Sequence, residues 1–210
     1  MKVMLTRRKA LVASFTLPVL LTSCTSSEPP KKAETPKAPP EPVTGRTAFF
    51  RMYSPARIWS PDIQVLRLNS LNLEQLRGEK GKYPAWEATF VSPSKRQARS
   101  FTYSVIEAGG NLHEGVFASR EEPFSGSSGQ ATPWAVQAFK IDSDKAYEVA
   151  LGKSADYVAK NPNKPMFFLL ELTPRHPNVA WRVVWGESVG TSDYSIYVDA
   201  TTGEFLERTK

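Results

Sequence analysis

The sequence predicts an α+β fold built from two copies of one unit, in which one helix packs on an antiparallel sheet of three or four strands. Three observations support this prediction. Residues 84–117 and 179–209 resemble each other, both segments alternate apolar and polar residues with a period of two, and residues 141–162 carry apolar residues at helical spacing. Period-two alternation is typical of half-buried strands, and self-similarity of this length indicates a repeated unit.

The alignment of the two segments defines the strands. Trp86 aligns with Trp181, and Gly110 aligns with Gly203. Each copy contains two alternating runs, then a glycine turn, then a last strand, read as LHEGVFA in the first copy and EFLERT in the second. The runs IQVLRL and MFFLLEL, which are rich in β-branched and aromatic residues, predict one further strand at the start of each sheet.

A helix is predicted before the second sheet, over residues 141–162. Asp142 or Ser143 is a suitable N-cap, and Pro162 ends the pattern. Gly152 lies inside this stretch, so we expect a bend there.

The first copy has a shorter helical signal. Ser54 and Pro55 match an N-cap followed by proline at the first helical position, and Pro61 ends the helix. The stretch EEPFSGSSGQATP, residues 121–133, is rich in glycine, serine and proline and predicts a joint between the copies.

The N-terminus predicts an exported, lipid-anchored protein. Four basic residues among the first nine precede an apolar run of eleven residues, which is typical of a secretory signal and too short to span a bilayer. Leu21, Thr22 and Ser23 lead to Cys24, the only cysteine. This order resembles the lipobox of bacterial lipoproteins, which implies a signal peptide over 1–23 and a lipid on Cys24. A soluble secreted protein with an unmodified cysteine is the alternative.

Residues 24–45 predict a tether. The segment from Thr25 to Gly45 has six prolines, three lysines and three glutamates, a composition that cannot bury enough apolar area to fold.

Without the signal peptide the chain keeps 23 basic and 21 acidic residues, a net charge of +2. This balance argues against nucleic-acid binding. Thr25, by analogy with lipoproteins of diderm bacteria, indicates the outer membrane, facing the periplasm.

The folded part resembles the PepSY domain of bacterial envelope proteins, a cystatin-like α+β unit. The resemblance rests on DSDKA in the helix, a WRV strand and the closing VDATTGE hairpin. It implies one unit over 46–120 and a second over 134–210, and a role in ligand binding or in restraining peptidases. The family has no agreed catalytic residues, so the resemblance assigns none here.

No catalytic, metal or cofactor motif is recognised in the sequence. The only histidines, His113 and His176, lie in polar turns without a second ligand at metal-binding spacing, so we expect solvated turn residues. Neither a nucleophile elbow nor a phosphate-binding glycine loop is present.

Six residues are candidates for binding a partner. Lys95, Arg96 and Arg99 are predicted to share one loop, which would suit an anionic partner, although a solvated hairpin tip is the simpler explanation. The period-two pattern predicts that Trp86 and Trp181 belong to the core. The other tryptophans, which could line a groove between the copies, are Trp59, Trp134 and Trp185.

Two functions remain open. The preferred one is a non-catalytic envelope lipoprotein that binds a protein or peptide, including as a peptidase inhibitor. The alternative is an envelope hydrolase or carbohydrate-processing enzyme with a site between the copies. No metal or nucleic acid is expected as a partner.

The anchor can be tested directly. We expect Cys24→Ser to release the protein from membranes, because the fatty chains would have no attachment point. Membrane sedimentation of the two forms measures this, and unchanged sedimentation of the variant would contradict the anchor.

Overall fold

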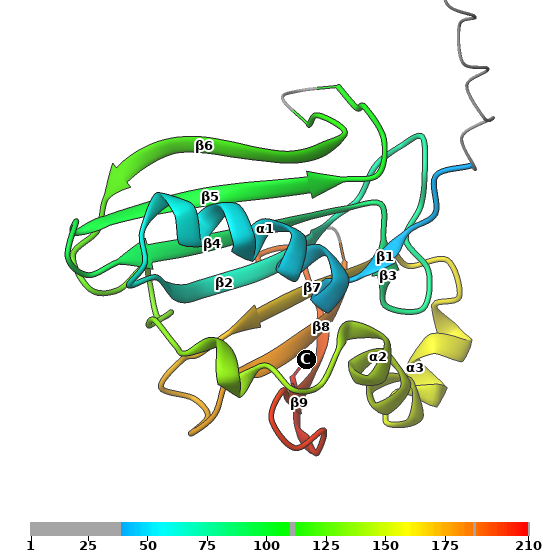
Figure 1. The fold of residues 1–210 in the computed structure, drawn as a ribbon. Coiled ribbons are helices and arrows are strands. Elements are labelled where there is room, and N and C mark those ends of the chain that lie inside the picture. Colours follow the sequence, from blue (N-terminus) through cyan, green and yellow to red (C-terminus); the bar gives the residue numbers. More distant parts are fainter. Residues whose placement is uncertain (1–38, 110–111, 187, 210) are drawn as a thin grey trace, which may run out of the picture. The chain divides into compact units, whose positions relative to one another are not determined.

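The fold is organised by one antiparallel sheet of eight strands in the order β10-β9-β8-β7-β2-β4-β5-β6, with the helices on one face (Figure 1). The structure is a computed structural model that describes residues 39–109, 112–186 and 188–209. The predicted α+β class with antiparallel strands is confirmed.

The sheet strands are β2 (Gln64–Leu71), β4 (Ala85–Ser92), β5 (Gln97–Ser104), β6 (Gly115–Pro123), β7 (Met166–Glu171), β8 (Ala180–Trp185), β9 (Tyr194–Asp199) and β10 (Phe205–Thr209). Two short strands, β1 (Val43–Thr44) and β3 (Lys82–Tyr83), pair separately. The helices are α1 (Gly45–Trp59), α2 (Ser143–Gly152) and α3 (Ala155–Lys160), with a 3-10 turn at Val136–Ala138.

The order of helix followed by four sheet strands occurs twice along the chain. The first sheet strand of each half, β2 or β7, lies at the centre, and the last, β6 or β10, lies at an edge. Arg67, Leu68 and Asn69 of β2 pair with Glu171, Leu170 and Leu169 of β7, which joins the halves into one sheet.

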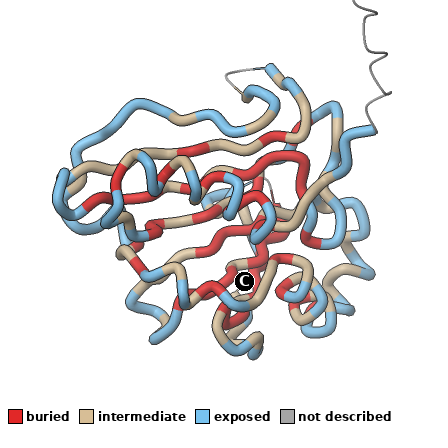
Figure 2. The backbone as a smooth tube through the Cα atoms, viewed as in Figure 1, coloured by how far each residue is buried: buried red, intermediate tan, exposed pale blue. Residues whose placement is uncertain are grey.

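One hydrophobic core spans both halves. Its largest fully buried side chains include Trp86 and Trp181, both 0% exposed, whose ring centroids lie 6.2 Å apart in an edge-on arrangement. Burial is concentrated in the central strands and on the inner sides of the helices (Figure 2). The prediction that these two tryptophans belong to the core is confirmed.

Each of these tryptophans is tied to the start of its own helix. The Trp86 indole donates to the Val43 carbonyl (3.0 Å), and the Trp181 indole donates to the Ile141 carbonyl (2.8 Å). Val43 and Ile141 each directly precede the N-cap of the following helix. The same bond therefore occurs at equivalent positions in the two halves.

The N-termini of α1 and α2 meet above this tryptophan pair. The Asp142 carboxylate accepts hydrogen bonds from the backbone amides of Arg46 (2.8 Å) and Ser143 (2.6 Å), so one side chain satisfies donors of both helices. The buried Ser143 hydroxyl accepts from the Gly45 amide (2.7 Å) and donates to the Gly81 carbonyl (2.6 Å). This junction fixes the two helices relative to each other.

The predicted start of the first helix is wrong. The helix α1 begins at Gly45, with Thr44 as N-cap, and Pro55 lies inside it. A proline at this position removes one backbone hydrogen bond and costs about 3 kcal/mol. Burial of Phe49 and Met52, together with Ala48 and Ala56, along the inner face offsets this cost.

The predicted tether is consequently too long at its C-terminal end. Val43 and Thr44 form β1, and Gly45 opens α1, so these residues belong to the folded body. The predicted signal peptide (1–23), the lipobox-like residues, Cys24 and the predicted tether up to residue 38 lie outside the described residues, as does Gly110.

The second helical segment agrees closely with prediction. Asp142 is the N-cap of α2, and the helix ends at Gly152, so the expected bend is a break before α3. The Ser154 hydroxyl donates to the Ala150 carbonyl (2.6 Å) and supports the end of α2. Gly203 lies in the predicted glycine turn and has a positive φ of 84°.

The joint between the halves contributes to the sheet. Residues 121–123 belong to β6, so the joint begins later than predicted. Val65 of β2 and Trp134 exchange two backbone hydrogen bonds (2.9 and 2.8 Å) beyond the stretch that β7 covers. Ala131 in the joint and Trp134 directly after it are buried, so the end of the joint is packed.

The helix junction contains a glycine, Gly81, that we expect not to tolerate substitution. Gly81 has a φ of +77°, and a Cβ there would lie 2.4 Å from the Ser143 carbonyl oxygen. We expect Gly81→Ala to lower the free energy of unfolding by about 2 kcal/mol or more, measured by urea denaturation. Gly190→Ala, with open space around its Cβ, is the matched control and should change it by about 0.5 kcal/mol at most. Equal losses for both variants would contradict this assignment.

Candidate interaction surfaces

Four of the predicted partner-binding residues come together at the C-terminal end of α1, in a cluster that we call the basic corner (Trp59, Lys95, Arg96 and Arg99). The Lys95 ammonium donates to the Trp59 carbonyl (2.7 Å) and lies 5.1 Å from the centroid of the Trp59 ring. The carbonyl end of a helix attracts cations, and the indole face adds to that attraction.

A carboxylate from the edge strand completes the corner. The Trp59 indole donates to Glu121 (2.7 Å), and Glu121 lies opposite Arg99 in the register of β5 and β6. The Arg99 guanidinium donates to the Ser119 carbonyl (2.8 Å) and stacks 5.5 Å from the Phe101 ring centroid. Arg99 is therefore a strand residue, and its predicted position in the loop is wrong.

Asp62 holds the hairpin that carries Lys95 and Arg96. Its carboxylate accepts hydrogen bonds from the hydroxyls of Ser60 (2.7 Å) and Ser92 (2.8 Å) and from the Ser94 amide (2.8 Å). The bond from Ser60 contributes most to lowering the pKa of Asp62 well below its ordinary value, followed by those from Ser94 and Ser92. The carboxylate is therefore ionised at neutral pH and fixes the hairpin against the end of α1.

Trp134 and Trp185 do not line a surface groove, so that prediction is wrong. They are 4% and 2% exposed. The Trp134 indole donates to the Leu66 carbonyl (3.3 Å), and Trp185 packs edge-on against Tyr157 and Tyr194. Large aromatic rings on the helix side of the sheet gain more from burial in the core than from a surface position.

The strand β6 offers an exposed edge. Along its nine residues it is intermediate or exposed, with Val116 at 39% and Phe117 at 45% exposure, and the upper rim in Figure 2 is correspondingly pale. Within the described residues it pairs only with β5. The sequence predicted the strand but could not show its edge position, because strand order depends on contacts between the halves.

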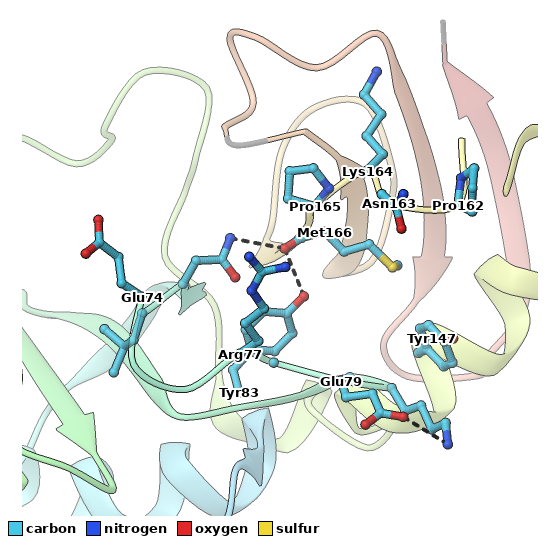
Figure 3. Close-up of a pocket in the computed structure, with 15 residues that line it drawn as sticks. Glu74, Arg77, Glu79, Tyr83, Tyr147, Pro162, Asn163, Lys164, Pro165 and Met166 are labelled. Carbon is cyan, nitrogen blue, oxygen red and sulfur yellow. Dashed lines mark hydrogen bonds and ion pairs between the residues drawn. The ribbon is translucent and has the colours of Figure 1, made fainter. Parts of the chain in front are cut away.

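A groove of about 760 Å³ opens between the halves (Figure 3). Residues 72–83 of the first half form one side, and Tyr147 with residues 162–166 of the second half forms the other. The Met166 carbonyl accepts hydrogen bonds from the Tyr83 hydroxyl (2.9 Å) and the Asn72 amide (3.3 Å), which tie the two sides together.

The groove is lined by polar and apolar groups alike and carries charges of both signs. Glu79 pairs with Lys80, whereas Lys164 pairs with Asp193 outside the lining. Burial raises the pKa of the Tyr83 hydroxyl, which therefore stays protonated and donates to Met166. No serine, cysteine or histidine is among the described residues that line it.

The sheet face away from the helices has a charged cluster that the sequence analysis missed. In the sheet register Arg67 lies opposite Glu171, and Arg175 and Arg182 lie 5.1 and 5.5 Å from the ring centroid of Tyr197. Burial raises the pKa of Glu171, whereas Arg67 and Arg182 oppose that shift. Period-two alternation could have revealed this cluster, because it places Arg182 on the sheet face opposite that of Trp181.

The two histidines differ. The His113 side chain is 53% exposed and pairs with Glu107 (2.7 Å), which confirms a solvated turn residue. The His176 side chain is only 11% exposed, packs 5.1 Å from the Tyr197 ring centroid and lies 3.0 Å from Glu207, so its prediction as a solvated residue is wrong.

Neither a metal site nor a membrane span is found in the part of the chain that the structure describes. No group of three or more histidine, cysteine or acidic side chains there could hold an ion. Of the helices in the same ranges, none is both long and apolar enough to cross a bilayer.

Comparison with known proteins gives one structural similarity. No family model matches the chain, and no curated protein matches its sequence. The crystal structure of a "putative lipoprotein" from Clostridium difficile 630 is similar with a TM-score of 0.43 and 10% sequence identity, over 77% of this chain and 91% of that one. A similarity at this level assigns neither a family nor a function.

The role of Asp62 can be tested through its pH dependence. Its pKa is lower in the folded protein, so its contribution to stability is present above the ordinary value of about 4 and is lost as the pH falls below that value. We expect Asp62→Ala to lower the Tm at pH 7 and the difference from wild type to shrink below about pH 4. Asp156→Ala, an exposed carboxylate in α3, is the control. A difference that grows on acidification would contradict this role.

Proposed function

We propose that this chain is an envelope lipoprotein whose folded body binds an extended segment of a protein partner along β6, without catalysing a reaction. The exposed, unpaired edge of β6 is the observation that carries the proposal. Sheet edges bind extended peptides through backbone hydrogen bonds, and side chains along the edge provide selectivity. The signal sequence and Cys24 support export and lipid anchoring.

The peptide groups that would accept a partner strand can be identified. The Ser100 amide donates to the Ser119 hydroxyl (3.1 Å), so the backbone of Ser100 points towards β6. Alternation along β5 then points Thr102 in the same direction, and Thr102 lies opposite Phe117. The peptide group of Phe117 therefore faces β5, and those of Val116 and Ala118 face outwards.

The edge is protected at its C-terminal end. A bulge follows Ala118, and Arg120, Glu121, Glu122 and Pro123 carry charge or lack an amide donor. Natural proteins use such features to block unwanted pairing. The stretch Val116–Ala118 lacks them and has exposed apolar side chains. We infer that the partner strand pairs with this stretch.

We also propose that the two halves derive from one PepSY-like unit. The repeated order of elements and the equivalent indole bonds of Trp86 and Trp181 support common descent. Restraint of a peptidase, the role that the resemblance implies, would be one use of an edge that holds an extended chain. The mixed-charge groove offers less support for the hydrolase alternative, because no serine, cysteine or histidine is among the described residues that line it.

The proposal is tested by crosslinking in cells that express the full chain. A photoreactive phenylalanine analogue at Phe117 should crosslink to a discrete protein partner, and Val116→Pro should abolish the product by removing an outward amide. Because proline is tolerated where the amide faces solvent, Val116→Pro should leave the Tm within a few degrees of wild type. The same analogue at Thr202, on an exposed turn, is the control and should not give that product. Crosslinking that survives Val116→Pro, or fails at Phe117 in the folded protein, would contradict the proposal.

A further inference from the structure

The outer face of α1 combines positive charge with exposed apolar side chains. Seven of its residues are exposed, namely Arg46, Thr47, Phe50, Arg51, Ser54, Arg57 and Ile58. At about 100° per residue they fall within an arc of about 140°, so they form one stripe. Ile58 is 87% exposed and Phe50 is 45% exposed. The helix contains no aspartate or glutamate.

The basic corner extends this stripe beyond the end of the helix. Lys95 and Arg96 are exposed at the hairpin tip, and Lys95 is fixed against the last carbonyl of α1. The stripe and the tip together carry five cations: Arg46, Arg51, Arg57, Lys95 and Arg96. Three carboxylates near the stripe each accept local hydrogen bonds: Asp62 from the hairpin, Glu121 from the Trp59 indole, and Asp142 from the helix junction.

The position of α1 along the chain points to its partner. The preceding residues that the structure describes, 39–44, lead directly into α1, so the predicted anchor at Cys24 is connected to the body at this helix. Residues 25–42, which connect Cys24 to β1, reach at most about 56 Å in extended form and keep α1 near the membrane. The helix is then held at high effective concentration beside the lipid headgroups.

We propose that the outer face of α1, with Lys95 and Arg96, docks on the headgroups of an anionic phospholipid bilayer. The arginines attract the negative surface, and Ile58 and Phe50 insert at the headgroup boundary, as in helices that lie in the membrane interface. Docking orients the body on the membrane, in addition to the anchoring that the lipid supplies. This inference is independent of the binding of a partner strand to β6.

The native tryptophans provide a selective probe. All five lie in the described ranges, and four of them, Trp86, Trp134, Trp181 and Trp185, are at most 4% exposed. Trp59 is partly exposed and adjoins Ile58, so a quencher in the bilayer reaches Trp59 first. The full chain is mixed with vesicles of phosphatidylcholine, with or without phosphatidylglycerol, whose acyl chains are brominated.

We expect tryptophan quenching with the phosphatidylglycerol vesicles and little with phosphatidylcholine alone. Trp59→Phe should remove the quenched component. The double variant Arg51→Glu/Arg57→Glu should weaken the docking of α1 on these vesicles at least tenfold, since each basic residue near an anionic surface contributes about fivefold. Both side chains are exposed, so the fold should be kept, as circular dichroism can verify.

The matched control is Lys160→Glu/Arg208→Glu, which changes the net charge equally but alters exposed residues of α3 and β10. It should quench like wild type. Equal quenching of wild type by both kinds of vesicle, or quenching that persists in the folded Arg51→Glu/Arg57→Glu variant, would overturn the proposal. Binding of an acidic protein in place of the vesicles through the same arginines would also overturn it.

Discussion

The junction between the two helix N-termini is the constraint on which the rest of the fold depends. Two helix starts carry partial positive charge and unsatisfied amides, and their close approach is unfavourable unless an acceptor lies between them. Asp142 supplies that acceptor, while the Ser143 hydroxyl links α1 to the loop at Gly81. Beneath it, a Cβ on Gly45 would lie 2.9 Å from the Trp181 ring, so only a glycine allows this approach.

This arrangement determines which surfaces remain available. Because α1 is fixed at its N-terminus over the tryptophan pair, its inner face covers β2, β4 and β5, and its last turn ends above the hairpin that carries Lys95. The outer side of α1 and the far edge at β6 are left without a neighbour among the described elements. The two proposed interactions therefore use different surfaces, one for a membrane and one for a polypeptide.

The sequence predicted local features well and long-range ones poorly. The alternation around Trp86 and Trp181 identified strands and core, and Asp142 identified the start of α2, because these signals lie within a few residues of each other. The start of α1 was missed because Pro55 matched a favourable first position, whereas tertiary burial of Phe49 and Met52 selected a frame ten residues earlier. The clustering of Trp59 with Lys95 depends on contacts between distant segments, which no local pattern encodes.

The seam between β2 and β7 has a consequence for how such a protein can evolve. β7 pairs with only three residues of β2, and Trp134, which directly follows the joint, pairs with Val65. Either half on its own would expose the unpaired edge of its first sheet strand, β2 or β7. Such an apolar edge can pair with other copies and form fibrils. Loss or shuffling of one half as a free module is therefore disfavoured, because each half covers the exposed strand edge of the other.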